Sequence, residues 1–271
     1  MGPLGERGWQ RVRVAPTLMN ISDRSFRQAR VVFKAGKNRD GYFDADDLLQ
    51  QVDNAIDIFE ERTNGFATGL WMFDNAPSHQ RRAPNALSAR RMPKNPSNGW
   101  VHIKGGPRMR STTLPSGDPQ DLYFPDDHPV YPGWFKGMER IIRERGLWPA
   151  GGLLAQCEGF KCEPGLTNCC CRRLLFNEPD FVHQKSQLEE LVTSRGHICE
   201  FYPKYHCELN FIEQYWGAVK FRYRNFSNRP GTVGEMEARV LECLDSIPLN
   251  QIRRYVFSIL LNPVPDILQV C

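Results

Sequence analysis

Two acidic residues of this sequence lie in segments whose composition suits metal-dependent chemistry at phosphates. Asp74 directly follows an apolar run and belongs to the string FDNAPSH (73–79), and Glu213 lies within the string ELNFIEQYWGAVK (208–220). A carboxylate at the end of a strand and a second one on a nearby helix can together bridge divalent cations, which prefer oxygen ligands. Two such cations activate a water or hydroxyl at a phosphodiester and stabilise the leaving oxygen. For either acid taken alone, a helix cap or a surface charge is the simpler interpretation.

Cysteines between residues 157 and 171 form a second candidate site. Their spacing is Cys157-x4-Cys162-x6-Cys169-Cys170-Cys171. Zinc favours thiolate ligands in a tetrahedral arrangement, and three adjacent cysteines cannot easily all face one ion. The spacing therefore indicates Cys157, Cys162 and one or two of the three adjacent residues, and we take Cys157, Cys162, Cys169 and Cys171 as the candidate zinc ligands. The alternative is that these are free cysteines packed in a core, because the chain has no C-x2-C pair.

Basic residues are concentrated in two stretches that contain no acid, 80–110 and 220–229, whereas residues 41–61 contain seven acids and no base. Lysine and arginine side chains bind nucleic acid by displacing counterions from its phosphates. The same pattern is also typical of a solvated protein surface, so charge alone leaves both interpretations open. The candidate DNA-binding residues are Arg81, Arg82, Arg90, Arg91, Lys220 and Arg224.

Apolar periodicity predicts the elements that position these residues. Helical spacing of Leu48, Val52, Ile56 and Phe59 predicts a helix from Asp44 or Asp46 to about residue 64. We expect further helices over 134–145, 184–195, 233–246 and 249–261, and one that begins near 209 with Ile212, Trp216, Val219 and Tyr223 on its apolar face. Short apolar runs predict strands at 29–34 and 197–202 and a buried central strand at 67–73. Residues 84–132 are rich in Pro, Asn, Ser and Gly and are expected to form a long loop or insertion.

Composition narrows the class of protein. The chain has 271 residues, of which 41% are hydrophobic and 11% aromatic, enough to build a core and to exclude a largely disordered chain. Its formal net charge of +4 says little about partners. The sequence has no run of eighteen apolar residues and no apolar stretch behind its first charges, so we expect neither a membrane span nor a secretory signal. We therefore expect a soluble intracellular protein with reduced thiols.

The two acidic strings, in this order, resemble motifs of the mariner-type DDE transposases. FDNAPSH is similar to the motif of the second catalytic aspartate, and ELNFIEQYWGAVK to the motif of the third acid. Residues 29–254 resemble the transposase-derived DDE proteins abundant in fungal genomes, including the string GKNRDGYF (36–43) and the cysteine-rich insert. The resemblance implies an α/β, RNase H-like fold with a mixed sheet flanked by helices. It also implies Mg²⁺ or Mn²⁺ held by three acids, with Asp74 as the second and Glu213 as the third.

The sequence departs from the family pattern in three places. The first catalytic aspartate has no clear counterpart, and Asp23 is the only candidate upstream of the acidic helix. Asp74 and Glu213 are 213 − 74 = 139 residues apart, which implies that an insertion interrupts the fold. Phe211 stands where the family has proline. These departures predict a copy that is truncated at the first aspartate and catalytically incomplete.

The expected organisation is an irregular lead-in (1–28), an RNase H-like DDE domain (29–261) with a cysteine-bearing insertion at about 84–183, and an irregular tail (262–271). The expected function is DNA binding by a protein descended from a metal-dependent endonuclease and strand transferase. The alternative is a zinc-stabilised, non-catalytic module that binds nucleic acid or protein. For a eukaryotic protein the resemblance implies a nuclear location, and it leaves a homodimer open.

Overall fold

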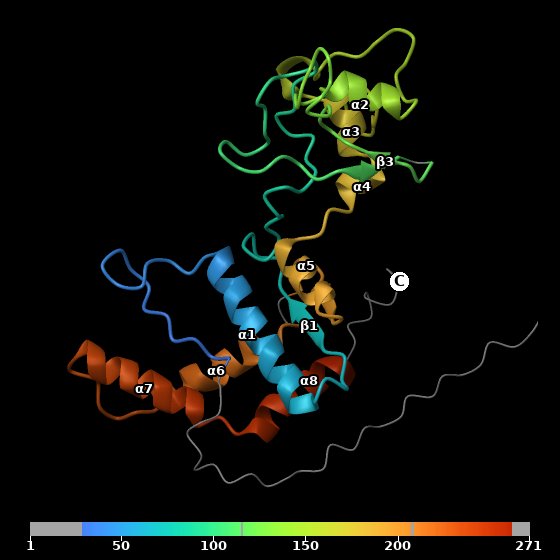
Figure 1. The fold of residues 1–271 in the computed structure, drawn as a ribbon. Coiled ribbons are helices and arrows are strands. Elements are labelled where there is room, and N and C mark those ends of the chain that lie inside the picture. The colour runs from blue at the N-terminus through green and yellow to red at the C-terminus, as the bar shows by residue number, and fades with distance from the viewer. Residues whose placement is uncertain (1–28, 115, 207–208, 262–271) are drawn as a thin grey trace, which may run out of the picture.

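The chain folds into two lobes joined by a narrow connection (Figure 1). The computed structural model describes residues 29–114, 116–206 and 209–261. The lower part in Figure 1, here called the sheet lobe, contains α1 (Ala45–Thr63), β1 (Leu70–Phe73), α5 (Gln187–Ser194), β4 (Ile198–Phe201), α6 (Phe211–Arg224), α7 (Val233–Asp245) and α8 (Leu249–Leu261). The upper part, the insertion lobe (residues 84–183), contains β2 (Thr112–Thr113), β3 (Pro119–Gln120), α2 (Met138–Glu144), a 3-10 turn (Glu158–Phe160), α3 (Cys171–Phe176) and α4 (Pro179–Val182). The described chain is thus a mixture of helices and two small sheets.

Strands β1 and β4 form a parallel pair from distant parts of the sequence. Leu70 lies opposite Ile198, and Phe73 lies opposite Phe201. Parallel strands carry their carboxyl ends to the same edge, so the segments that follow β1 and β4 leave the sheet together. The side-chain amide of Asn75 donates a hydrogen bond to the carbonyl of Tyr202 and ties these two exits to each other.

Helix α1 begins and ends where its sequence dictates. The Asp44 carboxylate accepts the N–H of Asp47 at 3.1 Å, and the Asp47 carboxylate accepts the N–H of Asp44 at 2.9 Å, which makes a reciprocal N-terminal cap. Asn64 ends the helix in the left-handed conformation, with φ 49°. Val52 and Ile56 are buried, and they pack with α5 in the core of the sheet lobe.

Much of the acidic run on α1 has its cationic partner inside the sheet lobe. The guanidinium of Arg195, just after α5, lies 2.8 Å from Asp53, 2.8 Å from Asp57 and 2.6 Å from Glu60. The hydrogen bond from Arg195 holds the pKa of Glu60 below its ordinary value. These ion pairs join α1 to the end of α5, so this part of the acidic run has a structural role.

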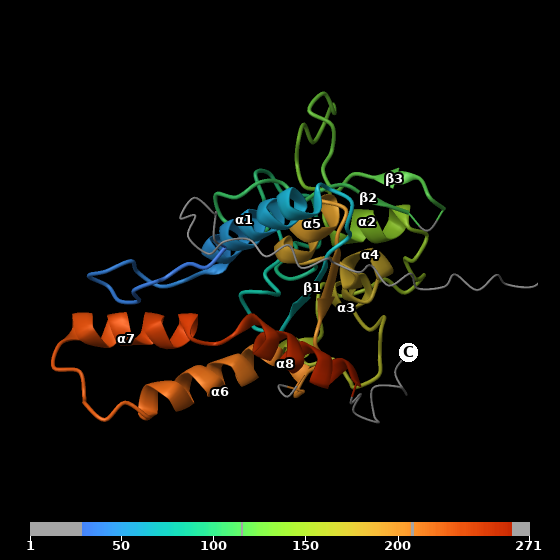
Figure 2. The same ribbon diagram turned by 90° about the horizontal axis from the view of Figure 1, so that it is seen from below.

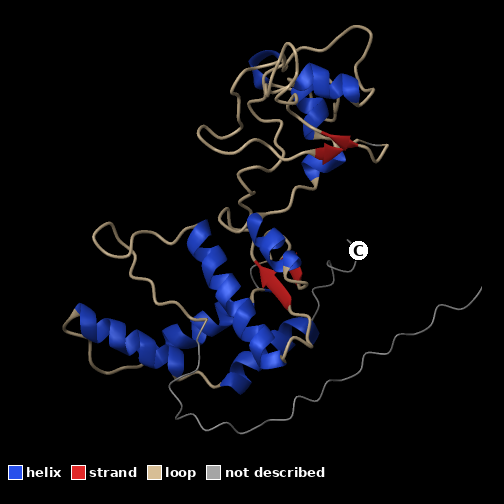
Figure 3. Cartoon of the chain, in the orientation of Figure 1, coloured by secondary structure: helices blue, strands red, loops and turns tan. Residues whose placement is uncertain are grey.

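The insertion lobe has its own hydrophobic core despite a large share of loop (Figure 3). Buried apolar side chains come from the loops before α2, from α2 itself, and from α3 and α4. The largest of them include Leu87, Met92, Leu122, Phe135, Met138, Ile141, Ile142 and Leu175. Because this core draws only on residues of the insertion lobe, the loop-rich segment is packed as a unit of its own.

A buried ion-pair network organises one side of the insertion lobe. Arg145 follows α2 with its side chain only 1% exposed, and its guanidinium lies 2.7 Å from Asp180 and 3.0 Å from Glu178. Its Nε donates to Gln120 Oε1 at 2.9 Å. Burial opposes ionisation of Asp180, but its hydrogen bonds with Arg145 and Thr112 outweigh that effect and hold the pKa of Asp180 below its ordinary value.

Helix α6 packs against both α7 and α8 (Figure 2). Val219 of α6 is buried against Cys243 of α7 and Ile247, which follows α7. The predicted apolar face of α6 is only partly correct, because Ile212 and Trp216 are exposed while Val219 is buried. No helix among the described residues is long and apolar enough to cross a bilayer.

Two strand predictions differ from the structure. Residues 29–35 form no strand, since no described strand lies beside them to accept their hydrogen bonds. Strand β1 is not a buried central strand: Leu70 is 58% and Met72 37% exposed. Helices α1 and α5 cover only the face that carries Trp71 and Phe73, which leaves the other face of β1 uncovered within the described chain.

Candidate metal centre and nucleic-acid interface

Four cysteines of the insertion lobe bring their sulfurs together. The Sγ atoms of Cys157, Cys162, Cys169 and Cys170 all lie within 4.8 Å of one another, and those of Cys162 and Cys170 are 4.0 Å apart. Four thiolates about 2.3 Å from a tetrahedral zinc stand roughly 3.8 Å from each other, so a small contraction would complete such a site. This group, here called the cysteine cluster, could hold a metal ion.

Backbone geometry decides which of the adjacent cysteines join the cluster. The predicted set contained Cys171, but the structure places Cys170 there and turns Cys171 into the core of the insertion lobe. Cys170 has an extended backbone with φ −156° and caps α3, and Cys171 is the first residue of that helix. The change from extended to helical backbone sends the two side chains in different directions, and the Cys171 thiol contacts the carbonyl of Leu153 at 3.9 Å.

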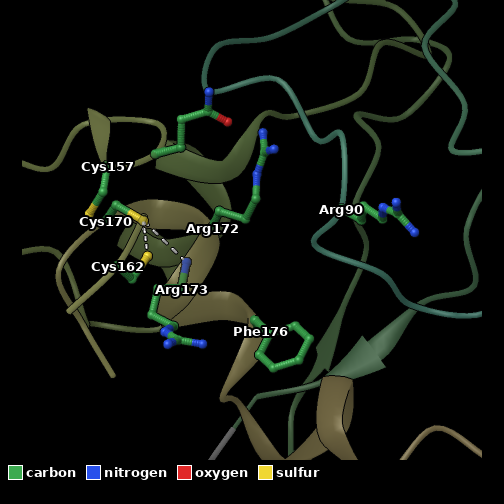
Figure 4. Close-up of a pocket in the computed structure, with 8 residues that line it drawn as sticks. Arg90, Cys157, Cys162, Cys170, Arg172, Arg173 and Phe176 are labelled. Carbon is green, nitrogen blue, oxygen red and sulfur yellow. Dashed lines mark hydrogen bonds between the residues drawn. The ribbon is translucent and has the colours of Figure 1, made fainter. Parts of the chain in front are cut away.

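The thiols of the cluster differ in acidity. Hydrogen bonding with Cys169, together with burial, raises the pKa of Cys157 to about 12, and the same two causes raise the pKa of Cys162. Burial opposes ionisation of Cys170, but hydrogen bonds from the Arg173 N–H and from Cys157 outweigh it and lower the pKa of Cys170. The Arg173 N–H lies 3.4 Å from the Cys170 sulfur (Figure 4). A metal ion bound here would require these thiols to be deprotonated.

A pocket of about 240 Å³ opens beside the cysteine cluster (Figure 4). Three arginines line it: Arg90, from the loop before α2, and Arg172 and Arg173 of α3. Phe176 and the sulfurs of three clustered cysteines complete the lining, together with Gln156. Although three arginines contribute to its walls, the surface exposed inside the pocket is almost entirely apolar.

Asp74 lies directly after β1, at the edge where β4 also ends. Its side chain is 52% exposed, and its Oδ1 lies 2.7 Å from His79 Nδ1. The same oxygen accepts the N–H of Ala76 at 3.0 Å, which shapes the turn of the FDNAPSH string. Asp74 is accordingly accessible, and one of its oxygens is already engaged by neighbouring donors.

Glu213 is exposed in the first turn of α6, whose N-terminal cap is Asn210. Among the described residues, the cysteine cluster is the only group of three or more His, Cys, Asp or Glu side chains with ligand atoms within 4.8 Å of one another. Asp74 and Glu213 therefore belong to no group of that kind among the described residues. Asp23, the candidate for the first acid, lies outside the described residues.

The predicted DNA-binding residues are distributed over both lobes. Arg81 pairs with Asp46 of α1 at 3.0 Å, and Arg82 lies at the connection, where it bridges to Ser186. Arg90 and Arg91 are exposed in the insertion lobe. Lys220 and Arg224 are exposed on α6, one turn apart, in the sheet lobe. The exposed bases thus fall into two separate groups, Arg90 with Arg91 in the insertion lobe and Lys220 with Arg224 in the sheet lobe.

Arg172 and Arg173, which line the pocket, were not predicted from the sequence, and Cys170 was considered but left out of the chosen zinc ligands. The sequence contains a hint of their role, since the two arginines directly follow the three adjacent cysteines, but only the fold shows that they line one pocket with Arg90.

No protein-family model matches this chain, and neither a curated protein nor a solved structure matches it significantly.

Proposed function

We propose that this chain is a nucleic-acid-binding domain of DDE-transposase descent that binds DNA without cutting it. The observation that carries the proposal is the parallel pairing of β1 and β4 with Phe73 opposite Phe201. The proposal includes an RNase H-like origin for the sheet lobe and, if the protein is eukaryotic, a nuclear location.

The pairing matters because it relates the two strings that resemble the transposase motifs. They are far apart in sequence, yet FDNAPSH follows β1 and the segment leading to α6 follows β4 at the same sheet edge. Ligand sites of open α/β sheets lie outside the carboxyl ends of the strands. Asp74 at that edge and Glu213 at the start of α6 are thus in keeping with a DDE ancestor.

Loss of cleavage follows from the shortage of acidic ligands. A two-metal phosphodiester site needs carboxylates that hold both cations, and Mg²⁺ tolerates little departure from octahedral geometry. Asp74 and Glu213 belong to no described group of three ligand side chains within 4.8 Å of one another, and one Asp74 oxygen is engaged by His79. Without a complete set, the attacking water and the leaving oxygen lack the cations that would activate and stabilise them.

Binding requires none of those acids. Lys220 and Arg224 form no ion pair with any described residue, and both are exposed on α6. Free cationic side chains on one helix face are suited to contact successive phosphates of a nucleic-acid backbone, independent of base sequence.

We expect the purified chain to shift duplex DNA of unrelated sequences, with an affinity that falls steeply as salt is added. Changing Lys220 and Arg224 together to Gln should reduce the slope of log K against log salt by about 1.8, since each phosphate contact contributes about 0.9. Lys37→Gln, an exposed lysine before α1, serves as the charge control and should leave the slope unchanged. A gel-shift salt series measures both.

The same preparation should leave supercoiled plasmid intact with Mg²⁺ or Mn²⁺. Metal-dependent nicking that disappears in Asp74→Ala would contradict the proposal and would show that another acid completes the site. Failure of the unmodified chain to bind any DNA at low salt would equally overturn it.

A second function is favoured by a specific observation, the convergence of four cysteine sulfurs. We propose that the cysteine cluster binds a structural Zn²⁺ that fastens the segment around residues 157–162 to α3. Closed four-thiolate sites are typical of structural rather than catalytic zinc. Metal analysis of protein purified without chelator should find one zinc per chain. A metal-free protein would contradict the proposed zinc site and would leave the proposal of DNA binding standing.

A further inference from the structure

A tight turn brings two members of the cysteine cluster back towards each other. It spans residues 163–166, has Pro164 and Gly165 at its centre, and is closed by a backbone hydrogen bond of 3.3 Å. Gly165 has φ 84°, a conformation that favours glycine, and proline before glycine is a common pair in such turns. The chain returns after the turn, and the Sγ atoms of Cys162 and Cys170 lie 4.0 Å apart (Figure 4).

The separation of these two sulfurs suits a second reaction besides metal binding. A disulfide holds its sulfurs about 2.05 Å apart, so Cys162 and Cys170 are separate thiols in hydrogen-bonding contact. A movement of about 2 Å between the sulfurs would bring them to bonding distance. The turn thus presents two thiols that an oxidant can join.

The pocket beside the cysteine cluster gives a small oxidant access to the sulfurs. Cys157, Cys162 and Cys170 line it, its volume is about 240 Å³, and the surface exposed inside it is almost entirely apolar. A water molecule occupies about 30 Å³ of liquid, and hydrogen peroxide has only one more heavy atom, so a peroxide fits this pocket. An apolar lining also admits a neutral molecule more readily than an ion.

The exposure of the sulfurs decides which of them an oxidant meets first. Cys162 is half-buried and lines the pocket, whereas Cys170, which also lines it, is buried. Cys171 is buried in the core of the insertion lobe and is not among the residues that line the pocket. Susceptibility of a cysteine to oxidation follows its exposure. Cys162 is therefore the thiol that a molecule in the pocket reaches first, and Cys170 is in contact with it.

We infer that the cysteine cluster is a site of reversible oxidation, at which a peroxide joins Cys162 and Cys170 in a disulfide and thereby releases the bound zinc. The inference rests on the proposed zinc site and adds its regulation. The disulfide itself requires only the geometry of the two sulfurs.

The reaction has two steps. The sulfur of Cys162 attacks one oxygen of hydrogen peroxide, so an S–O bond forms, the O–O bond breaks and hydroxide leaves, which gives a sulfenic acid on Cys162. The sulfur of Cys170 then attacks the Cys162 sulfur, so the S–S bond forms and the S–O bond breaks with loss of a second hydroxide. Two electrons pass from the sulfurs to the peroxide, and two protons convert both hydroxides to water.

Formation of this disulfide removes two of the four sulfurs that could hold a metal. The thiolate is the form of cysteine that ligates metal, and a disulfide contains none. Cys157 and Cys169 would remain, which is half of the tetrahedral set that structural zinc requires. The ion should therefore pass to solvent.

The test treats the full, zinc-loaded chain with hydrogen peroxide and follows released zinc with a chromogenic chelator. One zinc per chain should be released as two free thiols disappear. Trypsin cuts after Lys161 and Arg172 and at no residue between them, so the peptide 162–172 should be lighter by two hydrogen atoms. Treatment with a dithiol and added zinc should restore both thiols and the metal.

Variants separate the disulfide from the metal when they are compared without zinc. Cys170→Ala should slow the loss of the Cys162 thiol by at least about tenfold, because its partner is missing. Cys157→Ala removes a different member of the cysteine cluster and should form the disulfide as the unmodified chain does. Cys171→Ala and Cys199→Ala, at cysteines outside the cysteine cluster, are the further controls and should also form it.

The outcomes distinguish this inference from the zinc proposal. If the chain binds one zinc and peroxide leaves both the metal and the thiols unchanged, the oxidation site is overturned and the structural zinc stands. A disulfide in a chain that never held zinc would support the oxidation site and overturn the proposed metal. Oxidation that joins a different pair, or that proceeds equally fast in Cys170→Ala, would contradict the assignment of Cys162 and Cys170.

Discussion

Cys170→Ala is expected to abolish stoichiometric zinc binding, whereas Cys171→Ala should retain one zinc per chain. The two cysteines are adjacent and both are buried, so the substitutions remove equally buried thiols. Only Cys170 directs its sulfur into the cysteine cluster, while Cys171 packs in the core of the insertion lobe. Loss of a ligand should lower metal affinity by at least about a hundredfold, because even residues that only hydrogen-bond to a ligand typically contribute about 10–100-fold.

The difference in zinc binding between the two variants is measured as metal content after dialysis. The visible absorption of the cobalt-substituted proteins measures it independently. Chelation of the unmodified chain should also lower its melting temperature by about 10 °C or more, because a metal present far above its Kd contributes several kcal/mol to the folded state. Cys199→Ala, at a cysteine of β4, should behave as the unmodified chain does. Retention of zinc by Cys170→Ala together with its loss from Cys171→Ala would reject the ligand set seen in the structure.

Arg145→Ala should cost about 3–5 kcal/mol of folding free energy, because it leaves two carboxylates without their cation inside the insertion lobe. The guanidinium is almost fully buried and contacts both Asp180 and Glu178. Arg140→Ala, on helix α2 just before Arg145, is the matched control, since its side chain is exposed and lies 3.9 Å from Glu144. That exposed pair should contribute less than about 1 kcal/mol. Urea denaturation of the three proteins gives the free energies, and similar values for both variants would contradict the role of the buried network.

The pH dependence of this effect has a defined direction. Because the folded-state pKa of Asp180 is lowered, its stabilising contribution is fully present above the ordinary value of 3.8 and is lost as the pH falls through the lower folded value. The difference in stability between the unmodified chain and Arg145→Ala should therefore narrow below about pH 4. A difference that stays constant from neutral pH to pH 2 would show that Asp180 is not the group responsible.

Local signals predicted the helices of the sheet lobe well. The caps at Asp44 and Asn64 and the spacing of Val52 and Ile56 define α1 almost to the residue, because a helix satisfies its hydrogen bonds within one segment. The apolar runs before Asp74 and Tyr202 likewise became β1 and β4. The run at 29–34 did not become a strand, since a strand needs a neighbour that its own sequence cannot specify.

The insertion was the least predictable part. Its sequence lacks periodicity up to residue 132, yet the segment packs a core of its own around Phe135 and Ile141. The short helices α3 and α4 went unpredicted because segments of this length leave little hydrophobic pattern. Their place is fixed by long-range contacts such as the Arg145–Asp180 ion pair.

By itself, the sequence determined which residues can do chemistry: the acids Asp74 and Glu213, the cysteines of the insert, and the two basic stretches. Residue type and local spacing carry that information, because metal ligation and phosphate binding depend first on the atoms that a side chain offers. The tertiary structure alone decided which of them meet. The backbone turn between Cys170 and Cys171 selects one sulfur of two for the cysteine cluster, and folding of the insertion brings Arg90 to Arg173 across 83 residues of sequence (173 − 90 = 83). The direction of a side chain and the proximity of distant segments follow from packing, which no local pattern encodes.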